Sequence, residues 1–237
     1  MGATRLPGKM TKKIGGKPAL LHVIERVNKI KGCDAIILAT TDNKRDDVLE
    51  KIVKRANILV YRGSENDVLD RYYQAAKLFE LDIIVRITGD CPFLDPKITK
   101  DCIDVYMKGN YDYVSNCHPP FLPDGLDTEV CSFVALEKIW LNAKLPIERE
   151  HVFTYIFNNP KKFKIFNVSY EKDLSHLRLT LDEQADLLLL RKVYKKLYKK
   201  NPNFGLTEIE RLFEAEPELL NVNSDVVANP VSRWTKP

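Results

Sequence analysis

Short apolar runs alternate with amphipathic segments through the first half of the chain, and this alternation restricts the possible folds more than any other feature. Three runs rich in β-branched residues predict strands buried on both faces: residues 35–40, 58–61 and 82–87. Three segments with apolar residues at helical spacing predict amphipathic helices: residues 20–30, 46–56 and 66–79. Pro18 suits the first turn of the first helix, and Asn66 is the predicted N-cap of the third. Strand–helix alternation of this kind predicts an α/β fold with a mostly parallel sheet.

The second half of the chain mixes the two kinds of pattern. Four segments predict strands: residues 111–115, 129–133, 164–169 and 177–181. Four predict helices: residues 133–143, 148–158, 182–200 and 206–216. The residues from Asn221 onward are polar and read as a tail. Because no linker or repeat divides the sequence, we expect residues 1–237 to form a single domain, with a C-terminal helical extension and tail from about residue 201.

Charge and cysteine content argue against several classes of protein. The 237 residues include 37 lysines and arginines and 33 aspartates and glutamates, so the net charge of +4 is too small to indicate nucleic-acid binding. Five cysteines without a CxxC pair argue against a disulfide framework or a zinc site. Residues 1–17 do not resemble a signal peptide, and no apolar run reaches the roughly 20 residues of a membrane span. These features predict a cytoplasmic protein that does not bind membranes.

The segment from Gly2 to Lys9, with the sequence GATRLPGK, is the most informative loop. Its small residues allow the backbone to approach a ligand closely, and Arg5 and Lys9 supply positive charge for phosphates. The loop does not match the P-loop pattern, because five residues separate Gly2 from Gly8 and Met10 stands in place of serine or threonine. A flexible basic tail is the alternative interpretation.

Asp90 is the strongest candidate for a metal ligand. It follows the predicted strand 82–87, and ligands of open α/β sheets bind at the carboxyl ends of strands. Mg²⁺ takes oxygen ligands, and usually one or two of them are protein carboxylates. A turn or capping aspartate is the alternative for Asp90. Asp182, which opens a predicted helix, has the alternative role of a helix N-cap.

Several motifs occur in the same order as in a known family. The loop GATRLPGK is followed by IGGKPALLHVIERV, then by ATTD at 39–42, RGSENDVLDRYYQAA at 62–76 and RITGDCPFLDP at 86–96. The series continues with SN at 115–116, PDGLDTEV at 123–130, LPIEREHVFTYI at 145–156 and LRLTLDEQAD at 177–186. Over roughly residues 2–190 the chain therefore resembles the sugar-acid cytidylyltransferases. It is most similar to the spore coat polysaccharide branch, and more distantly to the enzymes that activate sialic acid and ketodeoxyoctulosonate.

This resemblance implies a Rossmann-like fold of the nucleotide-diphospho-sugar transferase (GT-A) type. It implies an Mg²⁺-dependent enzyme of surface polysaccharide biosynthesis that transfers CMP from CTP to an acidic sugar or related acceptor and releases pyrophosphate. The alternatives are another nucleoside triphosphate, a phosphorylated acceptor, or an inactive nucleotide-binding relic. The family often forms homodimers. Five aromatic residues are expected either to form the dimer contact or to belong to the core: Phe133, Trp140, Phe153, Tyr155 and Phe157.

The resemblance also implies roles for individual residues. Arg5 and Lys9 would hold the β- and γ-phosphates, whereas Asp90 and Asp182 would hold the metal, with Asp127 as the rival second ligand. The expected nucleotide contacts are Gly2, Ala3, Thr4, Thr41, Asp42, Asp67, Arg71 and Thr88. In this interpretation the Asp67 and Arg71 side chains, four residues apart, share one helical face, although an exposed ion pair is the alternative.

Acceptor binding is expected from Asn116, Asp127, Arg149, Glu150 and His151. The last three form a polar cluster at the start of a predicted helix, where Arg149 is suited to clamp a carboxylate or phosphate. A subunit contact is the alternative for this cluster. Asp124 and Glu129 are expected to be structural or to face the acceptor, and His22 to be structural.

Relatives in this family have an apolar strand directly before the Gly-x-x-R-L-x-x-K loop, whereas this sequence starts at Met1 inside that loop. We therefore expect the first, central strand to be missing from the sheet, which would leave unpaired backbone groups on two neighbouring strands. In this interpretation Met1 is an internal methionine of a longer chain, or the protein is truncated. The alternative is that another segment fills the place.

Overall fold

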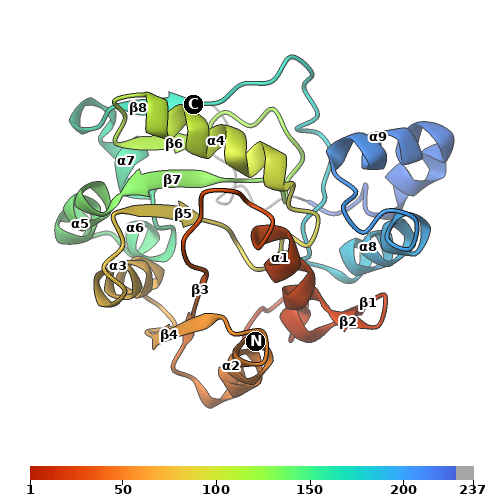
Figure 1. The fold of residues 1–237 in the computed structure, drawn as a ribbon, viewed down its shortest axis with the longest axis horizontal. Helices are drawn as coiled ribbons and strands as arrows, with labels where there is room; N and C mark the ends of the chain where they lie inside the picture. Colours follow the sequence, from red (N-terminus) through yellow and green to blue (C-terminus); the bar gives the residue numbers. More distant parts are fainter. Residues whose placement is uncertain (228–237) are drawn as a thin grey trace.

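Two groups of strands form the centre of the molecule (Figure 1). The structure is a computed structural model that describes residues 1–227. In the first group β3 (Ile37–Thr41) pairs in parallel with β4 (Leu59–Gly63). The second group has the order β5-β7-β6-β8, with the bounds β5 (Ile83–Arg86), β7 (Glu129–Ser132), β6 (Tyr113–Ser115) and β8 (Ile165–Asn167). The predicted α/β class is confirmed, but the arrangement is mixed, because β7 runs antiparallel to both β5 and β6.

The antiparallel strand has a simple cause in the chain path. The chain leaves β6 and returns in β7 through the loop 116–128, with no helix between the two strands. A direct return of this kind produces an antiparallel pair, whereas parallel neighbours need a longer crossover. The helices surround the strands and have these bounds: α1 (Ala19–Val27), α2 (Asp47–Lys54), α3 (Val68–Leu78), α4 (Pro96–Lys108), α5 (Phe133–Asn142), α6 (Pro146–Glu150), α7 (Thr154–Asn158), α8 (Gln184–Leu197) and α9 (Leu206–Ala215).

Side chains that alternate along the strands supply two hydrophobic layers. On one face Ile84, Tyr113 and Cys131 belong to a buried cluster with residues of α3, α5 and α7. On the other face Val114 and Val130 belong to a cluster with residues of α4. The period of two along each strand therefore decides which helix a side chain contacts.

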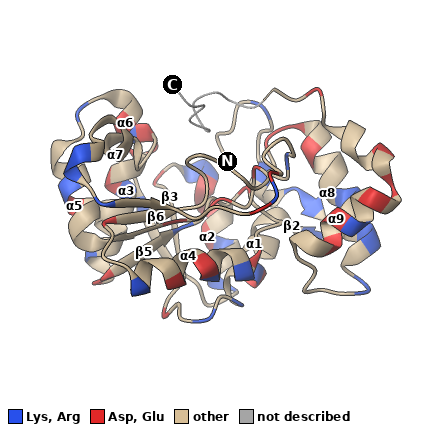
Figure 2. Ribbon diagram, turned by 90° about the horizontal axis from the view of Figure 1, so that it is seen from above, with Lys and Arg blue, Asp and Glu red and all other residues tan. Residues whose placement is uncertain are grey.

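The C-terminal helices pack against the loops that carry the predicted site. Figure 2 shows α8 and α9 grouped at one end of the molecule, near the short strand β2 (Lys17–Pro18). One hydrophobic cluster joins Leu6 and Phe93 to Phe204 and Phe213. The buried Arg26 donates to the carbonyl oxygens of Leu94 (3.0 Å) and Phe204 (2.9 Å), which fixes the segment after Asp90 against these helices.

Several predicted boundaries are wrong. Residues 177–181 do not form a strand, because their backbone groups bond to loops: Leu179 N–H donates to Asp124 (2.7 Å) and Leu181 N–H to Asp90 (2.8 Å). The helix predicted over 148–158 is divided between α6 and α7, so that Val152 and Phe153 are both buried. The N-cap of α3 is Asp67 instead of Asn66, since the Asp67 carboxylate accepts the Asp70 N–H at 2.8 Å.

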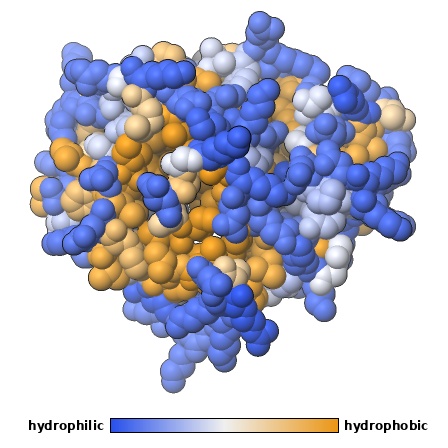
Figure 3. All heavy atoms as spheres, in the orientation of Figure 1, coloured by the Kyte–Doolittle hydropathy of each residue, from blue (hydrophilic) through white to orange (hydrophobic). Residues whose placement is uncertain are grey.

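The expected gap in the sheet is observed. Among residues 1–227 no strand lies between β3 and β5, so each of these strands has a ladder partner on one side only. The apolar side chains of Ile37, Leu38 and Val85 remain only partly buried. Figure 3 shows apolar atoms gathered over the middle of this face of the molecule.

Asp46 connects β3 to the start of α2 and gives a first prediction. Its carboxylate is 2% exposed and accepts hydrogen bonds from Thr40 Oγ1 (2.9 Å), Thr41 Oγ1 (2.7 Å) and the Met1 amino group (2.7 Å). Burial by itself would raise the pKa of Asp46, but these donors outweigh it and lower the pKa from 3.8 to about 2. The charged form is therefore stabilised by folding.

Asp46→Asn is expected to lower the free energy of unfolding by about 2 kcal/mol at about pH 7. A depressed pKa stabilises the fold above the unfolded value of 3.8 and loses this effect as the pH falls toward about 2. Urea unfolding at about pH 7 and about pH 3 should therefore show a smaller difference between variant and wild type at the lower pH. Asp47→Asn, at an exposed neighbour, is the control; equal effects at both positions would contradict the assignment.

Candidate active site

A polar cavity of about 150 Å³ lies beside the end of β5. It is lined by residues from the segments that follow β5 and β6, from the loop before α7 and from the segment before α8. Five of the predicted site residues line it: Thr88, Asp90, Asp127, His151 and Asp182. Burial lowers the pKa of His151, so this imidazole is neutral at neutral pH.

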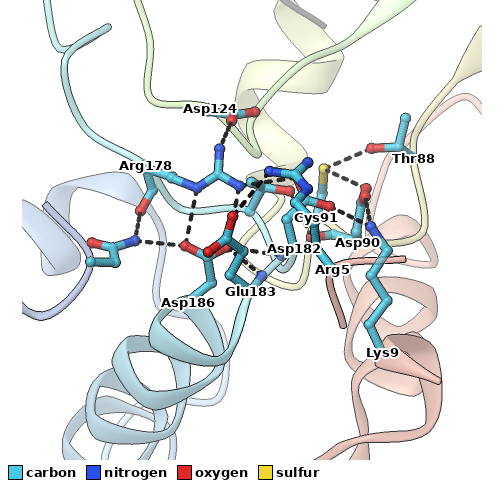
Figure 4. A network of polar contacts seen from close by, with 12 residues as sticks. Arg5, Lys9, Thr88, Asp90, Cys91, Asp124, Arg178, Asp182, Glu183 and Asp186 are labelled. Carbon is cyan, nitrogen blue, oxygen red and sulfur yellow. Dashed lines mark hydrogen bonds and ion pairs between the residues drawn. The ribbon is translucent and has the colours of Figure 1, made fainter. Parts of the chain in front are cut away.

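The cavity is bordered by two carboxylates that share one lysine. Lys9 Nζ lies 2.6 Å from Asp90 Oδ2 and 2.5 Å from Asp182 Oδ1 (Figure 4). Burial alone would lower the pKa of Lys9, but the two carboxylates raise it above its ordinary value. Burial likewise tends to raise the pKa of Asp90, and Lys9 holds it below its ordinary value. Lys9 and Asp90 are therefore both charged, and the ammonium marks a position that favours a cation.

Backbone contacts hold the two aspartates together although 91 residues separate them in sequence. The Asp90 carbonyl accepts from Leu181 N–H (2.8 Å) and from Thr180 Oγ1 (3.2 Å), so the residue before Asp182 is fixed to Asp90 itself. Gly125 allows the neighbouring loop to come equally close. Its φ is +104°, and a Cβ atom there would lie 2.7 Å from the carbonyl carbon of Leu179.

Arg178 is the centre of the second half of the network. It bonds Asp124 (2.8 Å), Asp182 (3.0 Å) and Asp186 (3.1 Å), with only 9% of its side chain exposed (Figure 4). Asp186 is fully buried and also accepts the backbone N–H groups of Asp182 and Glu183 at 2.9 Å. The alternative role of Asp182 as a helix N-cap is wrong, because Glu183 is the N-cap of α8 and the Asp182 carboxylate faces Lys9 and Arg178.

The predicted phosphate-binding residues both contact this network. Arg5 bonds Asp182 at 2.9 Å and Glu183 at 3.4 Å. Gly2 lies apart from them, beside the ion pair of Arg45 and Glu65, and a Cβ at Gly2 would clash with the Arg45 guanidinium. Ala3 and Thr4 belong to the same loop, and neither residue lines the cavity.

Most predicted nucleotide contacts lie outside the cavity wall: Thr41, Asp42, Asp67 and Arg71. The prediction that Asp67 and Arg71 share one helical face is wrong, because Asp67 precedes α3 as its N-cap. Asp67 pairs with Arg149 at 2.6 Å, whereas Arg71 donates to the carbonyl oxygen of Ser64 at 3.0 Å. Thr41 Oγ1 donates to Asp46 instead of facing the cavity.

Three of the predicted acceptor residues also lie outside the wall. Asn116 is buried, and its amide bonds the carbonyl oxygen of Leu126 (2.9 Å) and the N–H of Thr128 (2.8 Å). Its hydrogen-bonding groups therefore hold the loop 126–128. Arg149 is bound to Asp67 and to the carbonyl oxygen of Trp140, and Glu150 is exposed. Asp127 and His151 remain as predicted acceptor residues in the cavity wall.

Comparison with known proteins assigns the family. Residues 1–225 match the family model described as "Cytidylyltransferase". The chain belongs to the cytidylyltransferase family. This cytidylyltransferase is 31% identical to the spore coat polysaccharide biosynthesis protein SpsF of Bacillus subtilis, over 92% of each chain. It is 35% identical to a 3-deoxy-manno-octulosonate cytidylyltransferase of Hydrogenovibrio crunogenus over 47% of this chain and 45% of that protein.

A solved structure supports the same assignment. The cytidylyltransferase of Leptospira borgpetersenii is 36% identical to this chain and superimposes with a TM-score of 0.87, covering 93% of this chain and 92% of that one. The resemblance noted in the motifs is therefore confirmed, and the chain is a nucleotidyltransferase. Within residues 1–227 of this cytidylyltransferase, no helix has the length and apolarity needed to cross a membrane.

Sequence reasoning missed several residues that line the cavity of the cytidylyltransferase, among them Arg86, Cys117 and His118. One signal was available for Arg86, since Arg86, Thr88 and Asp90 alternate and so lie on one face of an extended chain. Arg178 was also missed, although it alternates with Thr180 and Asp182 in the same way. Glu129 could not be placed from sequence, because only the register opposes it to Arg86.

Proposed function

We propose that this cavity is the site at which CMP is transferred from CTP to an acidic sugar or related acceptor, with Mg²⁺ and with release of pyrophosphate. The single observation that supports this most directly is the Lys9 ammonium between Asp90 and Asp182. Two carboxylates converging on one cation are the donor set that Mg²⁺ uses beside substrate phosphates. Asp90 and Asp182 would hold the metal, which would neutralise charge on the triphosphate.

The residues of the chain suit the remaining steps. An acceptor hydroxyl oxygen forms the new bond to the α-phosphorus and gives up its proton to water. The bond from the α-phosphorus to the oxygen that bridges to the β-phosphorus breaks, and pyrophosphate leaves with that oxygen. Arg5 and Lys9 lie beside the metal-binding carboxylates, where they can bind the β- and γ-phosphates once these arrive. Asp127 lines the same cavity and is the alternative second ligand.

The acceptor class and the pathway rest on relatives. SpsF is by its name a protein of spore coat polysaccharide biosynthesis, and the partial relative acts on 3-deoxy-manno-octulosonate. We therefore propose an acidic sugar and a role in surface polysaccharide synthesis. The test is pyrophosphate release with each of CTP, ATP, GTP and UTP, in the presence of Mg²⁺ and a panel of sugar acids. Release that is equal with all four nucleotides, or that does not need an acceptor, would reject the proposal.

A homodimer is proposed on the surface of α5 and its connection to α6. Trp140 stacks on Tyr73, and Phe153 and Tyr155 are buried, so the aromatic residues considered for this contact belong to the core. Large apolar side chains nearby are nevertheless exposed: Val134 (73%), Leu141 (56%) and Leu145 (54%). Sedimentation velocity at micromolar concentration tests the dimer, and a monomer alone would reject it.

Lys9→Met is expected to separate metal binding from nucleotide binding. In the wild type a metal must displace the Lys9 ammonium, and the lysine regains an anionic partner only when a triphosphate is present. Removing the ammonium should therefore raise the affinity for Mn²⁺ without nucleotide by about tenfold, while turnover falls about 10²-fold. Free Mn²⁺ measured by electron paramagnetic resonance gives the affinity. Lys12→Met, three residues later in the chain, is the control, and weaker Mn²⁺ binding in Lys9→Met would contradict the proposal.

A further inference from the structure

The wall of the cavity carries several carboxylates and a guanidinium. Four aspartates line it: Asp90, Asp124, Asp127 and Asp182. Arg86 is the one lysine or arginine among the lining residues that the structure describes. Arg86 is the last residue of β5, and Asp90 lies in the turn that follows four residues later. Arg86 is therefore the guanidinium that an anionic group of a ligand in the cavity can meet, beside its partner Glu129.

The register of the sheet places Arg86 in a row of polar side chains. Arg86 opposes Glu129, Glu129 opposes Ser115, and Ser115 opposes Asn167. Opposed residues project to the same face of a sheet, so the row supports one side of the cavity. Asn167 accepts the His118 N–H at 3.0 Å, which fixes the position of His118 in the cavity wall.

In this row of side chains the acceptor oxygens of Glu129 are already occupied, whereas Arg86 still has an N–H donor unused by residues 1–227. Both oxygens of Glu129 already accept, one from Arg86 and the other from Tyr113 Oη at 2.6 Å. Tyr113 is fully buried, so an amine on a ligand would have to compete with an enclosed partner. Arg86 has five N–H donors, and its Nε has no hydrogen-bond partner among the described residues. A ligand group that accepts hydrogen bonds is therefore favoured over one that donates.

The guanidinium of Arg86 is charged and mostly buried in its pair with Glu129. Burial lowers the pKa of Arg86, but Glu129 more than compensates and keeps the guanidinium charged. With 22% of its side chain exposed, the guanidinium is desolvated enough for charge-assisted hydrogen bonds to be strong. In the proposed function the triphosphate is neutralised by Mg²⁺, Arg5 and Lys9, whereas an anionic group of the acceptor would meet Arg86 alone among the described lysines and arginines of the wall. A single carboxylate therefore fits Arg86 better than a doubly charged phosphate.

We propose that Arg86, held in place by Glu129, is the residue that selects the acceptor by its carboxylate and orients its hydroxyl toward Asp90. This rests on the proposed cytidylyl transfer and adds to it the group by which the acceptor is recognised. Arg86 acts on acceptor binding, whereas Arg5, Lys9, Asp90 and Asp182 act on the nucleotide. The two sets of residues are therefore separable by experiment.

The experiment compares sugar acids with their neutral amides. The probes are 3-deoxy-manno-octulosonate and N-acetylneuraminate, each beside its C1 amide, with CTP and Mg²⁺. The variant R86Q/E129Q removes both charges of the pair, so that no unpaired carboxylate is left buried. In the wild type kcat/KM should favour the better acid over its amide by about 10²-fold. In the variant this ratio should fall to about 1 through the KM of the acceptor, with the KM of CTP within about twofold.

The control is K100Q/D104N, which removes an ion pair from the exposed side of α4 and should leave the ratio unchanged. Melting temperatures of both variants check the fold. Saturation-transfer NMR of each acid and amide measures binding without turnover, and only the acids should lose binding in R86Q/E129Q. An acid preference that survives in the variant, or a wild type that turns over the amides as well as the acids, overturns the inference. No pyrophosphate from CTP with any acceptor would reject the proposed function instead.

Discussion

Asp90→Asn is expected to lower turnover about 10²–10³-fold while the protein stays folded. Asp90 lies at the carboxyl end of β5, where its carboxylate shares Lys9 with Asp182. An amide has the same shape but is a much poorer ligand for Mg²⁺ than a carboxylate. The backbone carbonyl of Asp90, which fixes Leu181 and Thr180, is unchanged by the substitution. The loss should therefore appear in catalysis and not in stability.

Pyrophosphate release at saturating CTP measures this effect, and thermal unfolding measures stability. Asp104→Asn removes an aspartate from the exposed part of α4 and should retain full activity. Asp182→Asn and Asp127→Asn distinguish the two candidates for the second ligand, since only the true ligand should match Asp90→Asn. Activity of Asp90→Asn within a few-fold of the wild type would reject Asp90 as a metal ligand.

Arg178→Met is expected to reduce the free energy of unfolding by about 3–5 kcal/mol. The guanidinium bonds three carboxylates, and one of them, on Asp186, is fully buried. Without Arg178 the buried charge of Asp186 keeps only the Asn223 amide and two backbone N–H groups as donors. Removing one partner of a buried charge costs more than the pair contributes, because the remaining charge stays desolvated.

The melting temperature of Arg178→Met should fall by about 10 °C for a chain of this size. Arg178→Lys retains the charge but lacks the planar fork that reaches three carboxylates, so it should restore only part of the loss. Arg191→Met, on the exposed surface of α8, is the control. Equal melting temperatures for Arg178→Met and Arg191→Met would show that the network does not stabilise the fold.

The alternating pattern of the sequence correctly predicted the α/β class and most elements. Strands β3, β4 and β5 and helices α1, α2 and α3 lie where apolar periodicity placed them, within a few residues. The strand predicted over 177–181 failed for a specific reason. Its alternation of apolar and polar residues is real, but its backbone groups bond the loops at Asp124 and Asp90 instead of a neighbouring strand. The periodicity of apolar residues predicts which side chains are buried. It does not predict which segment the backbone will form hydrogen bonds with.

For the candidate site too, some features could be predicted from the sequence and others depend on the tertiary structure. The sequence by itself supplied the candidate groups: a loop with Arg5 and Lys9, an aspartate after a strand, and a second aspartate before a helix. Only the tertiary structure decided that Lys9, Asp90 and Asp182 meet, and that Arg178 and Asp186 support them. It alone opposed Glu129 to Arg86, because register depends on how the chain returns between strands. The local sequence decides which functional side chains a segment carries. Long-range backbone pairing decides which of these side chains meet in one cavity.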